Sequence, residues 1–175
     1  MDSSEFLGFL TSRSSVREYG SAPITEDEIG YILSCARTAP SAGNLEAWDV
    51  IVVTDEDVRL QLADAAFGQE HVGSAPVIFV VCANYVRSMS RYGERGILYA
   101  VQDATIAGTY MMLALHAREL HSCWTGAFDE DEVRSVLELP QHIRPIILLA
   151  AGHGHPPAEL TGRMSEGEHV HREKW

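Results

Sequence analysis

The chain has 175 residues, of which 46% are hydrophobic, and its 13 Lys and Arg residues stand against 25 Asp and Glu residues, for a formal net charge of −12. This length suits one globular domain with a sizeable core, and the negative charge disfavours a general affinity for nucleic acid or for an anionic membrane surface. Three cysteines without CxxC spacing, and an N-terminus without a basic leader before an apolar run, predict a cytoplasmic protein with free thiols.

The first half of the chain predicts helices and strands in alternation. The segment SSEFLGFLTSR carries apolar side chains at helical spacing, with Ser3 or Ser4 as its expected cap. A second helix begins with a capping box formed by Thr25 and Glu28 and stops before Pro40. WDVIVVT and APVIFVVCAN are dense in β-branched residues and predict strands, and EDVRLQLADAAF predicts a helix between them.

The second half is dominated by a long segment from Gly96 to Leu120 that is apolar on nearly every side and rich in small residues. It predicts a helix buried by close neighbours, including another subunit. Within it, Gln102, Asp103, His116 and Arg118 argue against a membrane span. SCWTGAF predicts a strand and a turn, DEDEVRSVLEL a helix and RPIILLAAG a last core strand, whereas residues 153–175 are polar and lack a periodicity that could bury them. This order predicts a single α+β domain over residues 1–175, with helices on both sides of a mixed, largely antiparallel sheet.

The segment TSRSSVREYG concentrates arginine and serine in an otherwise acidic chain. Two guanidiniums, each able to make bidentate contacts, and two hydroxyls suit a phosphate dianion. Such short clusters are also common at solvated helix ends, so the cluster alone leaves both interpretations open. No Walker loop is present, and no GxGxxG motif follows a predicted strand.

A second motif, APSAGNLEAWDV, joins the second helix to the first strand. Together with RSSVREY, FGQEHVGSAPVIFVV, VQDATIAGTYMMLALHARELHSCWTGAF and LPQHIRPIILLAAGHGHPPAE, it resembles the flavin-dependent nitroreductase family over nearly the whole chain. The resemblance implies a homodimer that binds FMN at the subunit interface, with the tail 153–175 docked on the partner. It also implies a two-step cycle in which NADH or NADPH reduces the flavin before an electron-poor acceptor, such as a nitroaromatic or a quinone, is reduced.

The family's flavin contacts can be carried over residue by residue. They are Arg13, Ser14, Ser15 and Arg17 for the phosphate; Pro40, Ser41 and Asn44 from the other subunit; Gln69 for the pyrimidine edge; Thr125 and Gly126 near N5; and Arg163, which closes over the phosphate.

The chain departs from the family pattern at Glu46 and Ala47, where many members have Gln-Pro. A carboxylate near the reduced flavin would lower its reduction potential by like-charge repulsion. The connection YVRSMSRYGERG is short where larger relatives carry extra helices, which predicts an open site. A flavin-binding protein without turnover and a specialised flavin enzyme of the same superfamily remain alternatives, and the acceptor stays unassigned.

Other conspicuous side chains have simpler interpretations. The two HxH pairs, at residues 153–155 and 169–171, could ligate a metal, but they are interpreted as surface histidines and no metal site is predicted. Trp48 and Trp124 are expected in the core, and Cys123 is expected to be a buried packing residue. Trp175 is an apolar residue in a polar tail, which predicts docking on a partner subunit.

Overall fold

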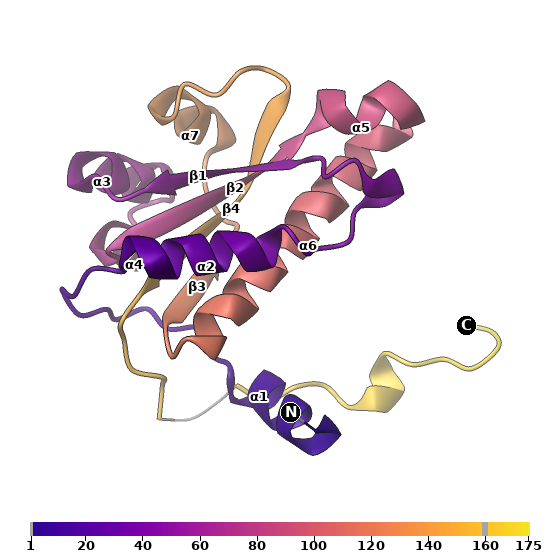
Figure 1. Ribbon diagram of the computed structural model, residues 1–175, viewed down its shortest axis with the longest axis horizontal. Helices are drawn as coiled ribbons and strands as arrows, with labels where there is room; N and C mark the ends of the chain where they lie inside the picture. The colour runs from indigo at the N-terminus through magenta and orange to yellow at the C-terminus, as the bar shows by residue number, and fades with distance from the viewer. Residues whose placement is uncertain (1, 159–160) are drawn as a thin grey trace.

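The computed structural model describes residues 2–158 and 161–175. Its centre is a four-stranded sheet made of β1 (Trp48–Val53), β2 (Val77–Asn84), β3 (His121–Thr125) and β4 (Ile143–Gly152), in the order β1-β2-β4-β3 (Figure 1). All three neighbouring pairs are antiparallel. The expected mixed sheet is therefore corrected, because the parallel contact on its edge is an isolated bridge between Ser15 and Ser122.

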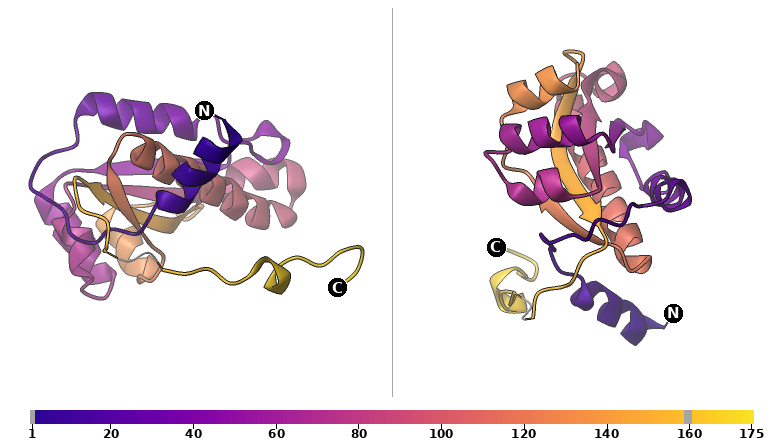
Figure 2. Two further views of the ribbon diagram at one scale, coloured as in Figure 1. Left: turned by 90° about the horizontal axis from the view of Figure 1, so that it is seen from below. Right: turned by 90° about the vertical axis from the view of Figure 1, so that its left-hand side faces the viewer.

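Helices cover both faces of the sheet, as Figure 2 shows. On one face lie α2 (Glu26–Ala36) and α6 (Arg95–Ala117), and on the other lie α3 (Glu56–Ala65), α4 (Glu70–Ser74) and α7 (Glu130–Val136). The alternation of side chains along β2 produces the two cores: Phe79 and Val81 pack with α2 and α6, whereas Ile78 and Val80 pack with α3 and α7. The predicted α+β arrangement is confirmed.

Most of the predicted elements are found, with local corrections. The capping box of Thr25 and Glu28 opens α2 as expected. The first helix, α1 (Ser3–Ser12), is capped by Asp2 and not by either serine, because the Asp2 carboxylate accepts from the backbone N–H groups of Ser4 and Glu5. Trp48 and Trp124 are half-buried against the core, and the buried Cys123 has a raised thiol pKa because of its burial.

Two helices of the structure, α4 and α5 (Tyr85–Tyr92), were not predicted from the sequence. α4 has five residues, and α5 is a mostly polar segment that follows β2 directly. The side chain of Asn84, the last residue of β2, caps α5 by accepting from the N–H of Arg87 at 3.2 Å. A strand residue that also caps a helix leaves no loop signal between the two elements.

The two ends of the chain lie outside the layered body. α1 buries none of its residues, and residues 161–175 run away from the body as an exposed tail that contains a short 3₁₀ turn, η2 (Glu166–Glu168) (Figures 1 and 2). Trp175 is fully exposed, and all four histidines of the HxH pairs are exposed too. No helix within the described residues is both long enough and apolar enough to cross a membrane.

Candidate functional site

The segment Arg13–Arg17 forms a cradle along the free edge of β3. The N–H of Val16 donates to the carbonyl of Ser122 at 3.0 Å, beside the bridge at Ser15. The Tyr19 hydroxyl donates to the carbonyls of Val16, at 2.7 Å, and Ala150, at 3.1 Å. These bonds fix the backbone of the cradle to β3 and β4, so its side chains do not depend on α1 for their position.

The cradle opens into a cavity of about 700 Å³. All five residues expected to contact a phosphate line it together: Arg13, Ser14, Ser15, Arg17 and Arg163. Within the described part of the chain, the guanidiniums of Arg13 and Arg17 form no ion pair and donate no hydrogen bond, whereas Arg163 donates to the carbonyls of two neighbouring residues of the tail. The cavity therefore has a concentrated positive charge with hydroxyls beside it, which suits a phosphate dianion.

The turn after β3 lies next to the start of α4. The Gln69 side chain joins them, because its Nε2 donates to the carbonyls of Ala66 and Ala127, both at 2.8 Å. At Gly126 an added Cβ would approach only the indole Nε1 of Trp124, at 4.0 Å, so the space above this glycine is open. The structure thus brings Gln69 close to the turn that contains Gly126, with open space above the glycine.

His71 is a site residue that the sequence reasoning missed. It is 8% exposed, and its Nε2 lies 2.8 Å from the Thr125 hydroxyl. Burial lowers the pKa of His71, and the positive charge of Arg17 lowers it further. The His71 imidazole therefore holds the Thr125 hydroxyl near the cradle; its one sequence signal was its position two residues after Gln69.

The segment Pro40–Asn44 lies elsewhere, against the first half of α6. Pro40 and Ser41 line a cavity of about 550 Å³ together with Tyr99 and Asp103. The buried Asp103, 2% exposed, accepts from the N–H of Ala42 at 2.9 Å and from the N–H of Ala47 at 3.1 Å.

One departure from the family pattern, at Ala47, therefore has a structural consequence. Proline, the residue many members have there, has no N–H to donate to Asp103. The other departure, Glu46, is exposed and has a left-handed backbone, with φ of 47°.

The site residues thus form two groups at different positions along α6. Asp103 touches the Pro40–Asn44 segment, whereas His116 contacts Ser12, next to the cradle, at 3.0 Å. At 1.5 Å per residue these two helix positions are separated by about 20 Å. In Figure 1 the 3₁₀ turn η1 (Ala42–Asn44) accordingly lies near the α5 end of α6, and the chain that follows α1 lies near the other end of that helix.

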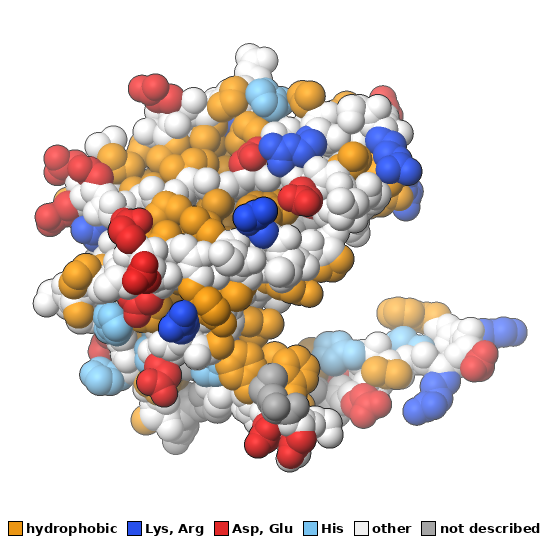
Figure 3. Space-filling model, viewed as in Figure 1, with side chains coloured by type: hydrophobic (Ala, Val, Ile, Leu, Met, Phe, Trp, Pro, Cys, Tyr) orange, Lys and Arg blue, Asp and Glu red, His pale blue; other side chains and the backbone are white. Residues whose placement is uncertain are grey.

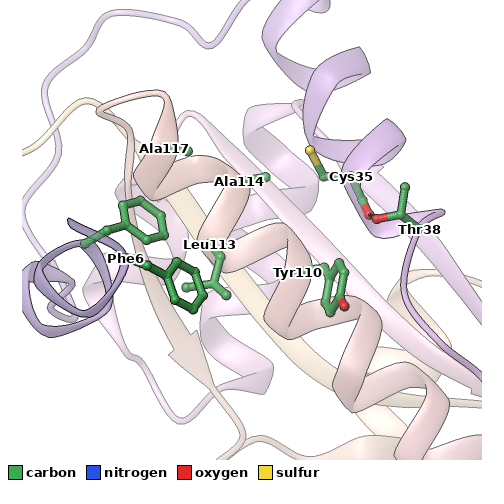
Figure 4. A pocket seen from close by; sticks show the side chains of 8 residues that line it. Phe6, Cys35, Thr38, Tyr110, Leu113, Ala114 and Ala117 are labelled. Atoms are coloured by element: carbon green, nitrogen blue, oxygen red, sulfur yellow. Dashed lines mark hydrogen bonds between the residues drawn. The ribbon is translucent and has the colours of Figure 1, made fainter. Parts of the chain in front are cut away.

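A third cavity, of about 560 Å³, lies between α1, α2 and α6 and is mostly apolar (Figure 4). α1 and α6 present Phe6, Tyr110 and Leu113 to it, and Cys35 and Thr38 lie on its α2 side. The lining contains no charged side chain.

Comparison with known proteins identifies the family of the chain. The family model described as "Nitroreductase family" matches residues 10–72 and 66–153. A putative NADH dehydrogenase/NAD(P)H nitroreductase of Archaeoglobus fulgidus is 31% identical, over 98% of this chain and 99% of its own length. An NADH dehydrogenase of Thermus thermophilus is 33% identical over 84% of each chain.

Among solved structures, nitroreductase A from Vibrio parahaemolyticus superposes with a TM-score of 0.90 at 26% identity, covering 100% of this chain and 78% of that one. Fold and sequence agree in one assignment. The chain belongs to the nitroreductase family.

Proposed function

We propose that this protein is an FMN-dependent oxidoreductase that passes reducing equivalents from NADH or NADPH to an electron-poor acceptor, such as a nitroaromatic or a quinone, in two successive half-reactions. Membership of the nitroreductase family makes it an NAD(P)H-dependent oxidoreductase, and the family is typically FMN-dependent. The observation that carries the choice of FMN is the cavity that gathers Arg13, Arg17 and Arg163. A phosphorylated flavin fits this charge better than uncharged riboflavin does.

Different residues around the cavity would contact different parts of the cofactor. Arg13, Ser14, Ser15, Arg17 and Arg163 would hold the phosphate. Both described donor contacts of Gln69 use its Nε2, so its Oε1 is the atom left to accept an N–H from the pyrimidine edge of the ring.

Near the ring, the chain's contribution is positioning. His71 orients Thr125, and the open space above Gly126 admits the ring close to the backbone. When bound, the flavin supplies the hydride chemistry, so the chain needs no acid–base pair of its own.

We further propose that the protein is a homodimer with the flavin shared between subunits. The separation of about 20 Å along α6 between the Pro40–Asn44 segment and the cradle supports this, because the two groups then contact flavins at different sites. Pro40, Ser41 and Asn44 would contact the cofactor held by the partner's cradle. The apolar cavity beside α1 and the exposed residues 161–175, which end in Trp175, are surfaces that a partner subunit would cover.

The experiment that tests this function is an anaerobic titration of the purified protein. We expect a yellow protein whose flavin absorbance bleaches on addition of NADH or NADPH and returns on addition of a quinone or a nitroaromatic. A flavin that stays oxidised with both nicotinamides would instead support a flavin-binding protein without turnover. A protein that binds no FMN would refute the proposal at its first step.

A further inference from the structure

Two arginines stand beside the Pro40–Asn44 segment without any ion-pair partner among the described residues. Arg91 lies in the last turn of α5 and Arg95 is the first residue of α6, and both are exposed. Figure 3 shows Lys and Arg side chains gathered at the α5 end of the molecule, in the upper right of the view. In a chain of net charge −12, unpaired cations at this place are an unusual concentration of positive charge.

Both guanidiniums are held against an aromatic corner. Arg91 lies over the ring of Tyr92, 5.6 Å from its centroid, and Arg95 lies over the ring of Tyr99, at 5.5 Å. The two rings meet edge to face, with centroids 4.9 Å apart. The four side chains therefore form one patch, called here the Arg–Tyr corner, in which each cation is steadied by a ring face.

The Arg–Tyr corner is attached to the Pro40–Asn44 segment. Arg91 donates to the carbonyl of Gly43 at 3.3 Å, and a Cβ on Gly43, where φ is 60°, would lie 2.3 Å from the Tyr92 hydroxyl. Arg95 donates through Nε to the Tyr99 hydroxyl at 2.8 Å, and Tyr99 lines the cavity that also contains Pro40 and Ser41. Tyr99 thus joins the Arg–Tyr corner to the wall of the cavity that Pro40 and Ser41 line.

A neighbouring arginine shows what a purely structural role looks like here. Arg87, on the same helix α5, pairs with Asp49 at 2.9 Å and donates to the carbonyl of Trp48 at 2.9 Å. Its hydrogen bonds hold the start of β1. Arg91 and Arg95 have no carboxylate within ion-pair distance in the described chain, so their charge is available to an incoming anion.

We propose that Arg91 and Arg95 bind an anionic group, a carboxylate or a phosphate, of an aromatic molecule that reaches the flavin beside Pro40 and Ser41. Guanidiniums recognise both anions through paired hydrogen bonds, and the tyrosines offer apolar faces to the aromatic part. The inference rests on the proposed function, since it takes this wall to face the flavin. Two sources supply the chemistry: an aromatic acid as electron acceptor, or the 2′-phosphate of NADPH.

The test compares pairs of similar ligands of which one carries an additional anionic group. For the acceptor, kcat/KM is measured with 4-nitrobenzoate and with the neutral 4-nitrobenzyl alcohol, with NADH as the donor. For the donor, kcat/KM is measured with NADPH and with NADH, with a neutral quinone as the acceptor. The variant combines Arg91→Gln and Arg95→Gln, and the matched control is Arg118→Gln, an exposed arginine that stacks on Tyr31 with 4.1 Å to the ring centroid.

We expect the double variant to lower one charged-to-neutral ratio by about tenfold, which is the order expected for losing charged hydrogen bonds at an exposed site. The ratio that falls identifies the source, and raising the salt concentration should shrink the same preference in the wild type. Calorimetric titration of the oxidised proteins with 4-nitrobenzoate and with NADP⁺ gives a readout that needs no turnover.

The outcomes separate this inference from the function beneath it. The inference is overturned if the wild type turns over but the two ratios and both affinities of the double variant stay within twofold of the wild-type values. The proposed function would then still stand. A wild type that binds FMN without oxidising NADH or NADPH would refute the proposed function. In that case the calorimetric comparison still decides whether the Arg–Tyr corner binds an anion.

Discussion

Asp103 is expected to be the residue that holds the Pro40–Asn44 segment in place. Its carboxylate is 2% exposed and accepts two backbone N–H groups, from Ala42 and Ala47, which flank the turn η1. In an Asp103→Asn variant one oxygen becomes an amide nitrogen that faces an N–H donor. That N–H is left buried without an acceptor, and the remaining bond loses its charge.

The magnitude follows from these two bonds. Hydrogen bonds to a charged group contribute about 1.5–3 kcal/mol each, so losing one and weakening the other should cost about 3 kcal/mol of unfolding free energy. For a chain of this size, each kcal/mol corresponds to about 2–4 °C in Tm, so we expect a drop of about 6–12 °C. The loss should be greatest locally, because both N–H groups belong to the same loop.

The assay is thermal unfolding followed by circular dichroism, together with hydrogen exchange at the amides of Ala42 and Ala47. Gln102→Ala is the control, since Gln102 is exposed on the same helix and makes no described hydrogen bond. A Tm within about 2 °C of the wild type, with unchanged exchange at both amides, would refute the assignment. Faster exchange at these two amides with little change in Tm would restrict the role of Asp103 to the loop.

The remaining predictions concern the cofactor, the tail and pH. Replacing Arg13 and Arg17 together by alanine should weaken FMN binding by about 1.5–3 kcal/mol per lost contact, measured by fluorescence titration; unchanged affinity would disprove the phosphate assignment. Ending the chain after Gly152 should lower the fraction of dimer, measured by light scattering, and the FMN occupancy of the purified protein. Glu46→Gln should raise the flavin midpoint potential by about 30 mV, roughly 1.4 kcal/mol for two electrons. Equal potentials of the two proteins in a potentiometric titration would show that the charge of Glu46 does not interact with the flavin. Because the pKa of His71 is lowered, the folded state binds its proton less readily than the unfolded state does. The contribution of His71 to the free energy of unfolding should therefore be complete above its ordinary pKa of about 6.5 and decline as the pH falls below it. His71→Gln should flatten this decline, measured by urea unfolding at several pH values.

Several features of this protein were determined by residues close together in the chain. The β-branched segments predicted β1 and β2, and the Thr25 and Glu28 pair predicted the start of α2, because strand preference and helix capping depend on neighbours within about four residues. The arginines and serines of the cradle are also local, since they lie within five positions of one another. Their grouping was visible before any fold was known.

Other features were decided by the tertiary structure. The order of strands places β4 between β2 and β3, and this choice depends on how both faces of the sheet are covered. Asp103 contacts residues about sixty positions earlier, and His71 bonds to Thr125 54 positions later. A side chain's polar partner at such a distance is selected by packing, which brings the groups together where water is excluded and leaves each with few alternatives. For that reason the sequence could suggest Pro40, Ser41 and Thr125 as site residues, but only the fold identified the two buried groups that hold them.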